Sequence, residues 1–366
     1  MAIGPTEGDR PDGVPKPAPS RPSFLQRIIS FFRAHPILTL LVLTPGIPEY
    51  LSGSSKLSGL VVAPLVFPIF LALNLGLYGP GVLLIREARV RWKVGFATVA
   101  VLAAAYGILE EGVALSTMFD PTSPNVGVLG GYGHWLGVNW IWVPSIVFFH
   151  TVFSICLPLL LFDLALPEQR GRSLLTRRGT WIVGSILVVD VLILMAITVL
   201  GLHYFMGPVI LGASLAVIGG LVLLARRVPP DLLARGRRGL AGSPLAYGLL
   251  GLSAFPAVLF SEAIPGALGW PASATFVLVC AVILAWCYFA GRRLTPGRDD
   301  RQLIALAAGL VLPVMVFGFV AQFPIEVVLL ADLAFGLFLL RLYRSASLRA
   351  AAGVPHRSAV PAHVTG

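Results

Sequence analysis

The sequence consists mainly of long apolar stretches separated by short polar connections. Ten stretches have about the 20 residues that a helix needs to cross the hydrocarbon core of a bilayer. They lie at residues 36–53, 59–85, 94–117, 138–165, 180–202, 206–225, 245–265, 270–290, 303–322 and 325–343. Backbone in lipid must satisfy its own hydrogen bonds, which favours helices here, because the stretches are too long for barrel strands. With only 12% charged residues, a soluble globular protein is excluded. The sequence predicts an all-α fold, a polytopic transmembrane helical bundle of about ten spans.

The positive charges predict the orientation of this bundle. Apart from Lys56, every Lys and Arg lies in the two terminal segments or in alternate connections between the stretches. This alternation follows the positive-inside rule and predicts that both termini are cytoplasmic. The net charge of +10 is then an orientation signal that also attracts anionic lipid, and it requires no nucleic-acid partner. The excess of Arg over Lys is typical of a GC-rich bacterial genome, so we expect a multi-pass protein of a bacterial plasma membrane.

The polar ends of the chain suggest a division into four parts. Residues 1–22 and 345–366 are rich in Pro, Gly, Arg and other polar residues, and we expect both to be disordered cytoplasmic tails. Residues 23–35 are expected to form an amphipathic helix at the inner bilayer surface, since apolar side chains recur along one helical face. The alternative is that this segment extends the first span inward. Residues 36–344 form the transmembrane domain in this interpretation.

Three ionisable residues inside the apolar stretches are the candidate functional site. Glu110 and Glu111 lie in the third stretch and His150 lies in the fourth. An ionisable group near the middle of a span costs about 2.5–3.5 kcal/mol on insertion scales, and no Lys or Arg is available at this depth. Adjacent helical residues point in different directions and cannot share one partner equally, so we expect Glu111 to face the bundle and Glu110 to face a neighbouring helix or a cavity wall. Gly107, one turn before Glu111, would allow that neighbour to approach closely. The alternative is a Glu–His contact that only pins two helices together.

A Glu-Glu pair on one membrane helix followed by a His on the next resembles the CAAX-protease and bacteriocin-processing (CPBP) family of intramembrane glutamate proteases. The resemblance covers about residues 95–160. It implies that Glu110, Glu111 and His150 are catalytic, with a glutamate and the histidine activating a water that attacks a peptide bond within the membrane. A membrane-embedded peptide would then be the substrate.

Two other classes of function remain open on the sequence. A proton- or cation-coupled secondary transporter for a small solute would use the same acids, with Asp190 or Asp332 as a deeper relay. A non-catalytic membrane scaffold would need none of them. We expect no cofactor, because the chain has no Gly-rich phosphate-binding loop or dinucleotide-binding pattern, and the sequence does not decide whether a metal binds. The connection 119–142 is interpreted as a lid over the outer cavity or as an ordinary hairpin.

Overall fold

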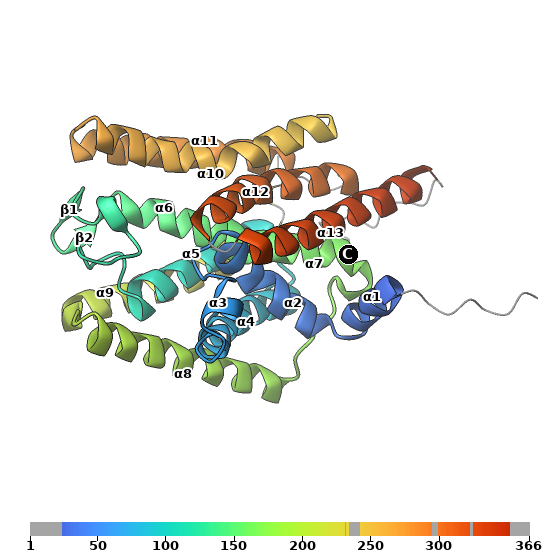
Figure 1. Ribbon diagram of the computed structural model, residues 1–366, viewed down its shortest axis with the longest axis horizontal. Coiled ribbons are helices and arrows are strands. Elements are labelled where there is room, and N and C mark those ends of the chain that lie inside the picture. Colours follow the sequence, from blue (N-terminus) through green and yellow to red (C-terminus); the bar gives the residue numbers. More distant parts are fainter. Residues whose placement is uncertain (1–23, 231, 234–241, 295–298, 323–324, 352–366) are drawn as a thin grey trace, which may run out of the picture.

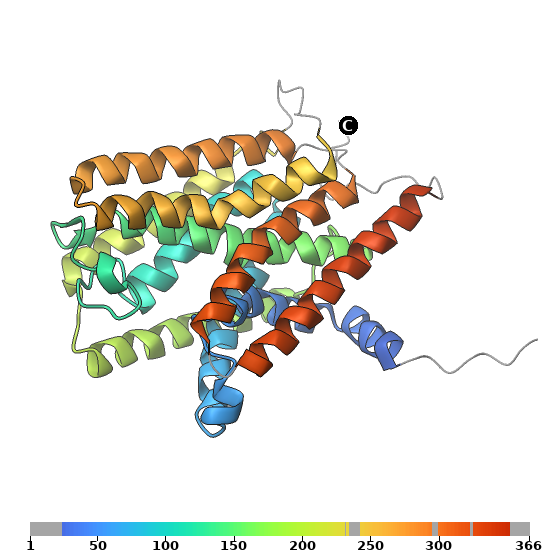
Figure 2. The ribbon, with the colours of Figure 1, turned by 45° about the horizontal axis from the view of Figure 1, so that its top comes forward.

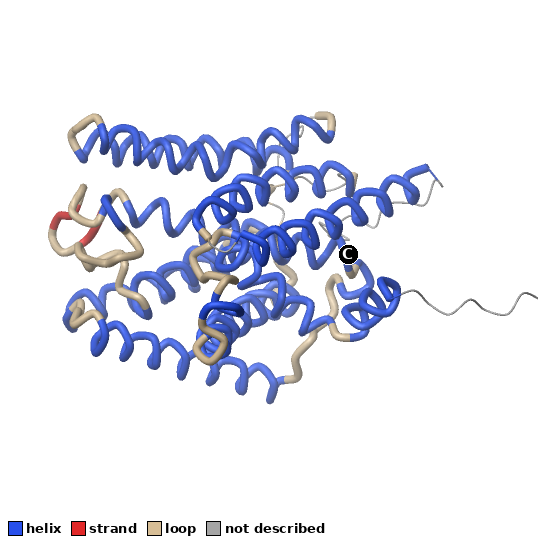
Figure 3. The backbone as a smooth tube through the Cα atoms, in the orientation of Figure 1, coloured by secondary structure: helices blue, strands red, loops and turns tan. Residues whose placement is uncertain are grey.

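The chain folds almost entirely into helices. The computed structural model describes residues 24–230, 232–233, 242–294, 299–322 and 325–351. Figure 3 shows a single short two-stranded sheet at one end of an otherwise helical molecule. The helices are α1 (Phe24–Ala34), α2 (Pro36–Pro45), α3 (Gly59–Val62), α4 (Phe67–Arg91), α5 (Phe96–Gly107), α6 (Trp142–Phe149), α7 (Leu157–Ala165), α8 (Arg177–Gly201), α9 (Gly207–Arg227), α10 (Pro244–Ala267), α11 (Ala272–Arg293), α12 (Asp300–Ala321) and α13 (Ile325–Ala351).

Shorter elements complete this description. Three π-helical segments interrupt or extend the helices: η1 (Gly46–Leu51), η2 (Ile108–Ala114) and η4 (His150–Cys156). Two 3₁₀ turns, η3 (Gly127–Leu129) and η5 (Pro167–Gln169), lie in connections. Strands β1 (His134–Trp135) and β2 (Val138–Asn139) pair antiparallel, with His134 opposite Asn139.

The predicted all-α polytopic bundle is confirmed, with a smaller number of clear spans than the ten expected. Within the described residues, 8 helices are long and apolar enough to cross a membrane. A ninth is counted if α1 and α2–η1, which meet at a bend of 101°, form one broken span. Helix α13 corresponds to the tenth predicted stretch, but Glu326, Asp332 and Arg341 make its apolar part too rich in ionisable groups to qualify.

The predicted boundaries can be compared with the structure only in part. The expected tail at 1–22 lies outside the described residues. The helix expected at 23–35 is present as α1, while its position at the bilayer surface remains a prediction. Helix α13 continues to Ala351, so the first part of the expected tail at 345–366 is helical, and the rest lies outside the described residues.

The two most buried spans form the centre of the molecule. In the apolar window of α6–η4–α7, 78% of the residues are buried within the protein, and in α5–η2 the share is 67%, against 11% for α9. Figures 1 and 2 show α8 on one side of this centre and α10–α12 on the other. The sheet and the α8–α9 and α10–α11 connections gather at one end, on the left of Figure 1, while α1 and the end of α13 lie toward the other.

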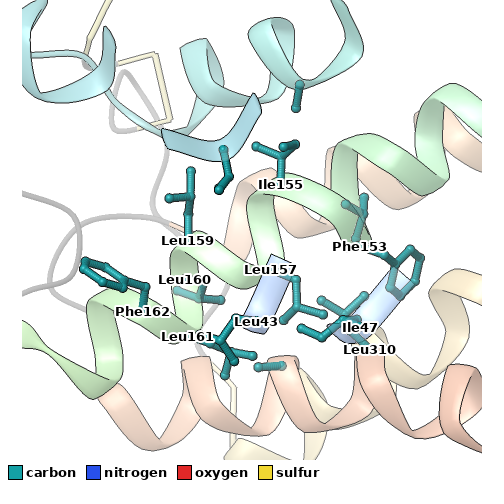
Figure 4. Close-up of a cluster of buried hydrophobic side chains, with 14 of the residues drawn as sticks. Leu43, Ile47, Phe153, Ile155, Leu157, Leu159, Leu160, Leu161, Phe162 and Leu310 are labelled. Atoms are coloured by element: carbon teal, nitrogen blue, oxygen red, sulfur yellow. The ribbon is translucent and has the colours of Figure 1, made fainter. Parts of the chain in front are cut away.

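The core is continuous from the first span to the twelfth helix. Figure 4 shows Leu43 and Ile47 of the first span packed near Leu157 and Leu310, which come from α7 and α12. Helix α7 is buried on all its faces, as expected for an apolar helix enclosed by other helices. The central helices are thus held rigidly by packing on every side.

Arginines gather at the end of the bundle where α4 and α9 end and α8 begins, called here the arginine-rich end. Buried ion pairs connect the helices there. Arg89 of α4 donates to Asp163 of α7 at 2.6 Å. Glu87, which is 2% exposed, accepts backbone hydrogen bonds from Leu174 and Leu175 in the connection before α8. These contacts join the end of α4 to the end of α7 and to the connection that leads into α8.

Candidate functional site

The candidate site is built from the three π-helical segments of the described chain. Segment η1 carries Glu49, η2 carries Glu110 and Glu111, and η4 carries His150. A π-helical turn inserts one extra residue into a helix, and such turns are rare and frequent at functional sites. Three of them meeting at one cluster is the strongest structural indication that this cluster has a function.

The local sequence explains part of this irregularity. Proline has no N–H, so Pro48 in η1 and Pro158 just after η4 each remove one α-helical hydrogen bond. Segment η2 contains no proline and is closed by a bond from the Leu115 amide to the Glu110 carbonyl at 2.9 Å. Two residues after its end lies Ser116, whose φ of 57° is uncommon for a residue other than glycine.

The His150 imidazole lies between two carboxylates. Its Nε2 is 2.9 Å from Glu111 Oε1, and its Nδ1 is 2.9 Å from Glu110 Oε2. Gly107 makes this approach geometrically feasible, because a Cβ built there would lie 3.1 Å from the His150 Cβ. The structure therefore brings together Glu110, Glu111 and His150, the three residues singled out in the sequence.

One detail of the prediction was wrong. We expected adjacent glutamates to point toward different surroundings, but both carboxylates flank the same ring. The imidazole has two nitrogens on different edges, so two neighbouring carboxylates can each reach one of them. Because adjacent residues of a helix point in different directions, the two carboxylates approach the ring from its two edges.

Glu111 is linked to the connection that leads from η2 to α6. The Thr117 hydroxyl donates to Glu111 Oε2, and the Trp142 indole donates to Thr117 Oγ1 at 3.2 Å. The positive φ of Ser116 reverses the chain so that Thr117 returns over Glu111. The Glu111 side chain is 10% exposed, against 1–2% for Glu110 and His150, so it is the most accessible member of the cluster.

The Glu110 side of the cluster is closed and crowded with polar groups. His150 Nδ1 also lies 2.9 Å from Ser154 Oγ, which competes with Glu110 for the same ring nitrogen. The buried hydroxyls of Tyr106 and Tyr78 also interact with Glu110, so polar side chains surround this carboxylate.

Glu49 joins the cluster through Tyr78. The Tyr78 hydroxyl donates to Glu49 Oε1 at 2.6 Å and also interacts with Glu110. Ser55 donates to Glu49 Oε2 at 2.5 Å. Glu49 was not among the site residues predicted from the sequence. The Pro-Gly-Ile-Pro run before it was the available signal, whereas nothing in the sequence distinguishes Tyr78.

Negative charge exceeds positive charge at this site. Two carboxylates contact one imidazole, a third is linked to them through Tyr78, and no Lys or Arg of the described residues forms an ion pair with any of the three. Burying unbalanced carboxylates is strongly unfavourable, so protons or a bound cation must neutralise part of this charge. The cluster is suited to holding and exchanging protons.

Glu110, Glu111 and His150 could also hold a metal ion. One ligand atom each from Glu110, Glu111 and His150 lies within 4.8 Å of the others. In the observed arrangement, however, the carboxylates occupy opposite edges of the ring. A metal on Nε2 would be bound by Glu111, and Glu110 would hydrogen-bond the opposite nitrogen, an arrangement that is common around histidine ligands.

The two deeper acids do not join the cluster. Asp190 of α8 packs against α4 at Gly76, where a built Cβ would lie 2.4 Å from Asp190 Oδ1. Asp332 lies on α13 at the edge of the bundle, partly exposed. Neither residue forms a hydrogen bond or an ion pair with Glu110, Glu111 or His150 among the described contacts.

The connection 119–142 is fixed against the bundle in this structure. The Asn139 side-chain amide donates to the Leu129 and Gly130 carbonyls, and its oxygen accepts from the Trp142 amide. Tyr204, from the α8–α9 connection, donates to the Phe119 carbonyl at 2.8 Å. The connection thus forms an ordered cap beside Thr117 and Glu111.

Comparisons with known proteins correct the family suggested by the motif. No curated protein and no solved structure matches the chain. The sequence model of a family described as an uncharacterized membrane protein family matches residues 38–357.

The resemblance to the CPBP family is therefore wrong. It depended on a Glu-Glu pair and one histidine, and a buried Glu–His contact of this kind can form in unrelated helical bundles. The chain also has Leu115 where that family has an arginine, and the Leu115 side chain packs against the apolar core. The matched segment spans nearly all of the helices and contains every residue of the cluster. The chain belongs to this uncharacterized membrane protein family.

Proposed function

We propose that the protein is a membrane-embedded hydrolase in which Glu111 activates a water molecule. The observation that carries the proposal is the contact of 2.9 Å between Glu111 Oε1 and His150 Nε2, with Glu110 on the opposite ring nitrogen. A base oriented by a second group, which is oriented in turn by a third, is the general arrangement of acid–base catalytic sites. Glu111 is the general base because it is the most accessible of the three.

The neighbouring groups have complementary roles in this proposal. A water held by Glu111 loses its proton to that carboxylate as it attacks an acyl carbon of the substrate. His150, with a proton on each ring nitrogen, stabilises the negative charge that develops and then supplies a proton to the leaving group. Glu110 and Ser154 hold the ring from the Nδ1 side. The substrate class is an ester or amide carried by a membrane-embedded molecule, including a membrane-embedded peptide.

Isotope labelling tests this proposal whichever ester or amide is the substrate. Purified protein is reconstituted with a total membrane extract of the expression host in water enriched in ¹⁸O, and products are identified by mass spectrometry. We expect ¹⁸O to enter a carboxyl product with the wild-type protein and with Asp332→Asn. Glu111→Gln should reduce the labelling by a factor of about 100 or more, since general-base catalysis contributes at least that much. Equal labelling with Glu111→Gln would contradict the proposal.

A second function, proton-coupled transport of a small solute, is favoured by one specific observation. Tyr78 connects Glu110 to Glu49, which accepts a hydrogen bond from Ser55. Asn74 in turn donates to Ser55 at 2.9 Å, so a chain of hydrogen bonds leads from the cluster to Asn74 on α4. Chains of this kind serve as proton relays in membrane transporters. Glu49→Gln separates the two functions: it should abolish proton flux into liposomes under a pH gradient but leave ¹⁸O labelling largely unchanged.

A further inference from the structure

A groove between α4 and α8 lies away from the carboxylate–imidazole cluster. Its volume is about 970 Å³, and its wall is mostly apolar, with Ile186, Val189 and Ile193 of α8 facing Ala72 of α4. An open apolar groove on the outside of a membrane bundle is filled by lipid. The polar groups at its two ends determine which lipid it prefers.

Two arginines stand at one end of the groove. Arg177 and Arg178 are the first residues of α8, and both are exposed and line the groove. Neither forms a hydrogen bond or an ion pair with another residue of the described chain. Guanidinium groups bind phosphate oxygens in a bidentate manner, so this end is complementary to an anionic headgroup.

The groove has the depth of one bilayer leaflet. From Arg178 to Asp190 the helix rises about 18 Å at 1.5 Å per residue. Half of a typical hydrocarbon core is about 15 Å, and the headgroup region adds to it. Trp181, one turn from the arginines and 72% exposed, is the kind of residue found at the level of the headgroups.

The lining continues one turn further, to Ile193, and near this deep end the groove is narrowed by Asp190. Its carboxyl group occupies the space that a side chain at Gly76 would fill, so α4 and α8 come together there. The groove can therefore hold an acyl chain that enters at the arginine-rich end and extends toward the middle of the bilayer. Two unpaired cations, an interfacial tryptophan and an apolar channel of leaflet depth together describe a phospholipid site.

We propose that the groove between α4 and α8 binds an anionic phospholipid of the leaflet at the arginine-rich end, with its phosphate on Arg177 and Arg178. The positive-inside rule assigns this end to the cytoplasm. The site is independent of the proposed hydrolase activity, because none of the residues lining the groove touches the Glu111–His150 pair.

Fluorescence quenching tests the site. The protein is reconstituted into phosphatidylcholine nanodiscs containing increasing fractions of phosphatidylglycerol brominated on its acyl chains. The Trp181 signal is the difference between wild type and Trp181→Phe. We expect this signal to be quenched at about tenfold lower fractions of brominated phosphatidylglycerol than of brominated phosphatidylcholine, and the preference to weaken at high salt. Equal quenching by the two lipids, or no effect of salt, would overturn the proposal.

Matched variants assign the preference to the groove. The double variant R177Q/R178Q should lose most of the preference, and R341Q/R344Q, which removes two exposed arginines of α13, should retain it. Native mass spectrometry provides a second readout. Val189→Phe fills the deep part of the groove and should lower the amount of retained phosphatidylglycerol, while Val217→Phe on α9 should not. Retention of the preference by R177Q/R178Q, or of the lipid by Val189→Phe, would show that the lipid binds elsewhere.

Discussion

His150 is the residue on which the buried cluster depends. It is the one basic side chain in contact with Glu110 and Glu111 in the described structure, and it is 2% exposed. Because water cannot screen charges at this depth, the imidazole and the carboxylates determine each other's protonation. The stability of the fold and the chemistry of the site are therefore linked through a single ring.

Removing this ring should destabilise the protein unless the carboxylates are removed with it. We expect His150→Gln to lower the free energy of unfolding by about 3–5 kcal/mol, since two buried carboxylates lose their partner. The triple variant H150Q/E110Q/E111Q carries no charge at the site and should recover most of this loss. Thermal unfolding in detergent, followed by tryptophan fluorescence, measures both effects.

A histidine outside the bundle supplies the control. His203 is exposed in the connection between α8 and α9, so His203→Gln should change stability by no more than about 0.5 kcal/mol. If His150→Gln were as stable as wild type, the two contacts of 2.9 Å would contribute nothing to the fold.

At the scale of single elements, the sequence predicted the helices much better than their irregularities. Long apolar stretches define a membrane helix by composition alone, so α4 to α12 correspond closely to the expected stretches. Whether a π-helical turn forms depends on whether neighbouring helices supply partners for the backbone groups that lose their α-helical hydrogen bonds. Gln322, the residue after α12, for example, donates to the Tyr50 carbonyl in η1 at 2.9 Å, a contact between residues far apart in the chain. Contacts of this kind explain why Glu49 could not be placed from local sequence.

Close contact between α10 and α12 depends on glycines on both helices. A Cβ built at Gly309 would lie 2.1 Å from the Gly248 carbonyl oxygen, and one at Gly251 would lie 2.3 Å from that of Leu306. Small residues allow membrane helices to approach at backbone distance. We expect Gly309→Val to force the helices apart and lower stability by about 1–3 kcal/mol.

The matched control for this change is Gly212→Val on α9, where a built Cβ meets no atom within 4 Å. It should be nearly neutral or slightly stabilising, because valine has a higher helix propensity than glycine. Both variants are compared by the midpoint of thermal unfolding in the same detergent. Similar midpoints for Gly309→Val and wild type would show that the α10–α12 contact is looser than described.

At the scale of the whole molecule, the bundle separates an arginine-rich end from an end that holds the ordered cap. Charge alternation predicted this polarity, and the helices of Figure 1 follow it: α8 begins at the arginine-rich end and α9 returns there. The meeting of Glu110, Glu111 and His150 was predicted only as residues on neighbouring spans. Both glutamates contact the His150 ring because two helices are offset relative to one another, and the sequence of a single span does not specify that offset.

Cysteine labelling in intact cells tests the predicted orientation. The native cysteines, Cys156, Cys280 and Cys287, all lie in helices and are replaced by serine. A single cysteine is then placed at exposed Asn125 in the cap or at exposed Arg172 before α8. We expect Asn125→Cys to react with a membrane-impermeant maleimide in intact cells, and Arg172→Cys to react only after permeabilisation, because cations are retained on the cytoplasmic side. The reverse pattern would place the cap and the Glu111 side of the cluster toward the cytoplasm. The anionic lipid proposed for Arg177 and Arg178 would then belong to the outer leaflet.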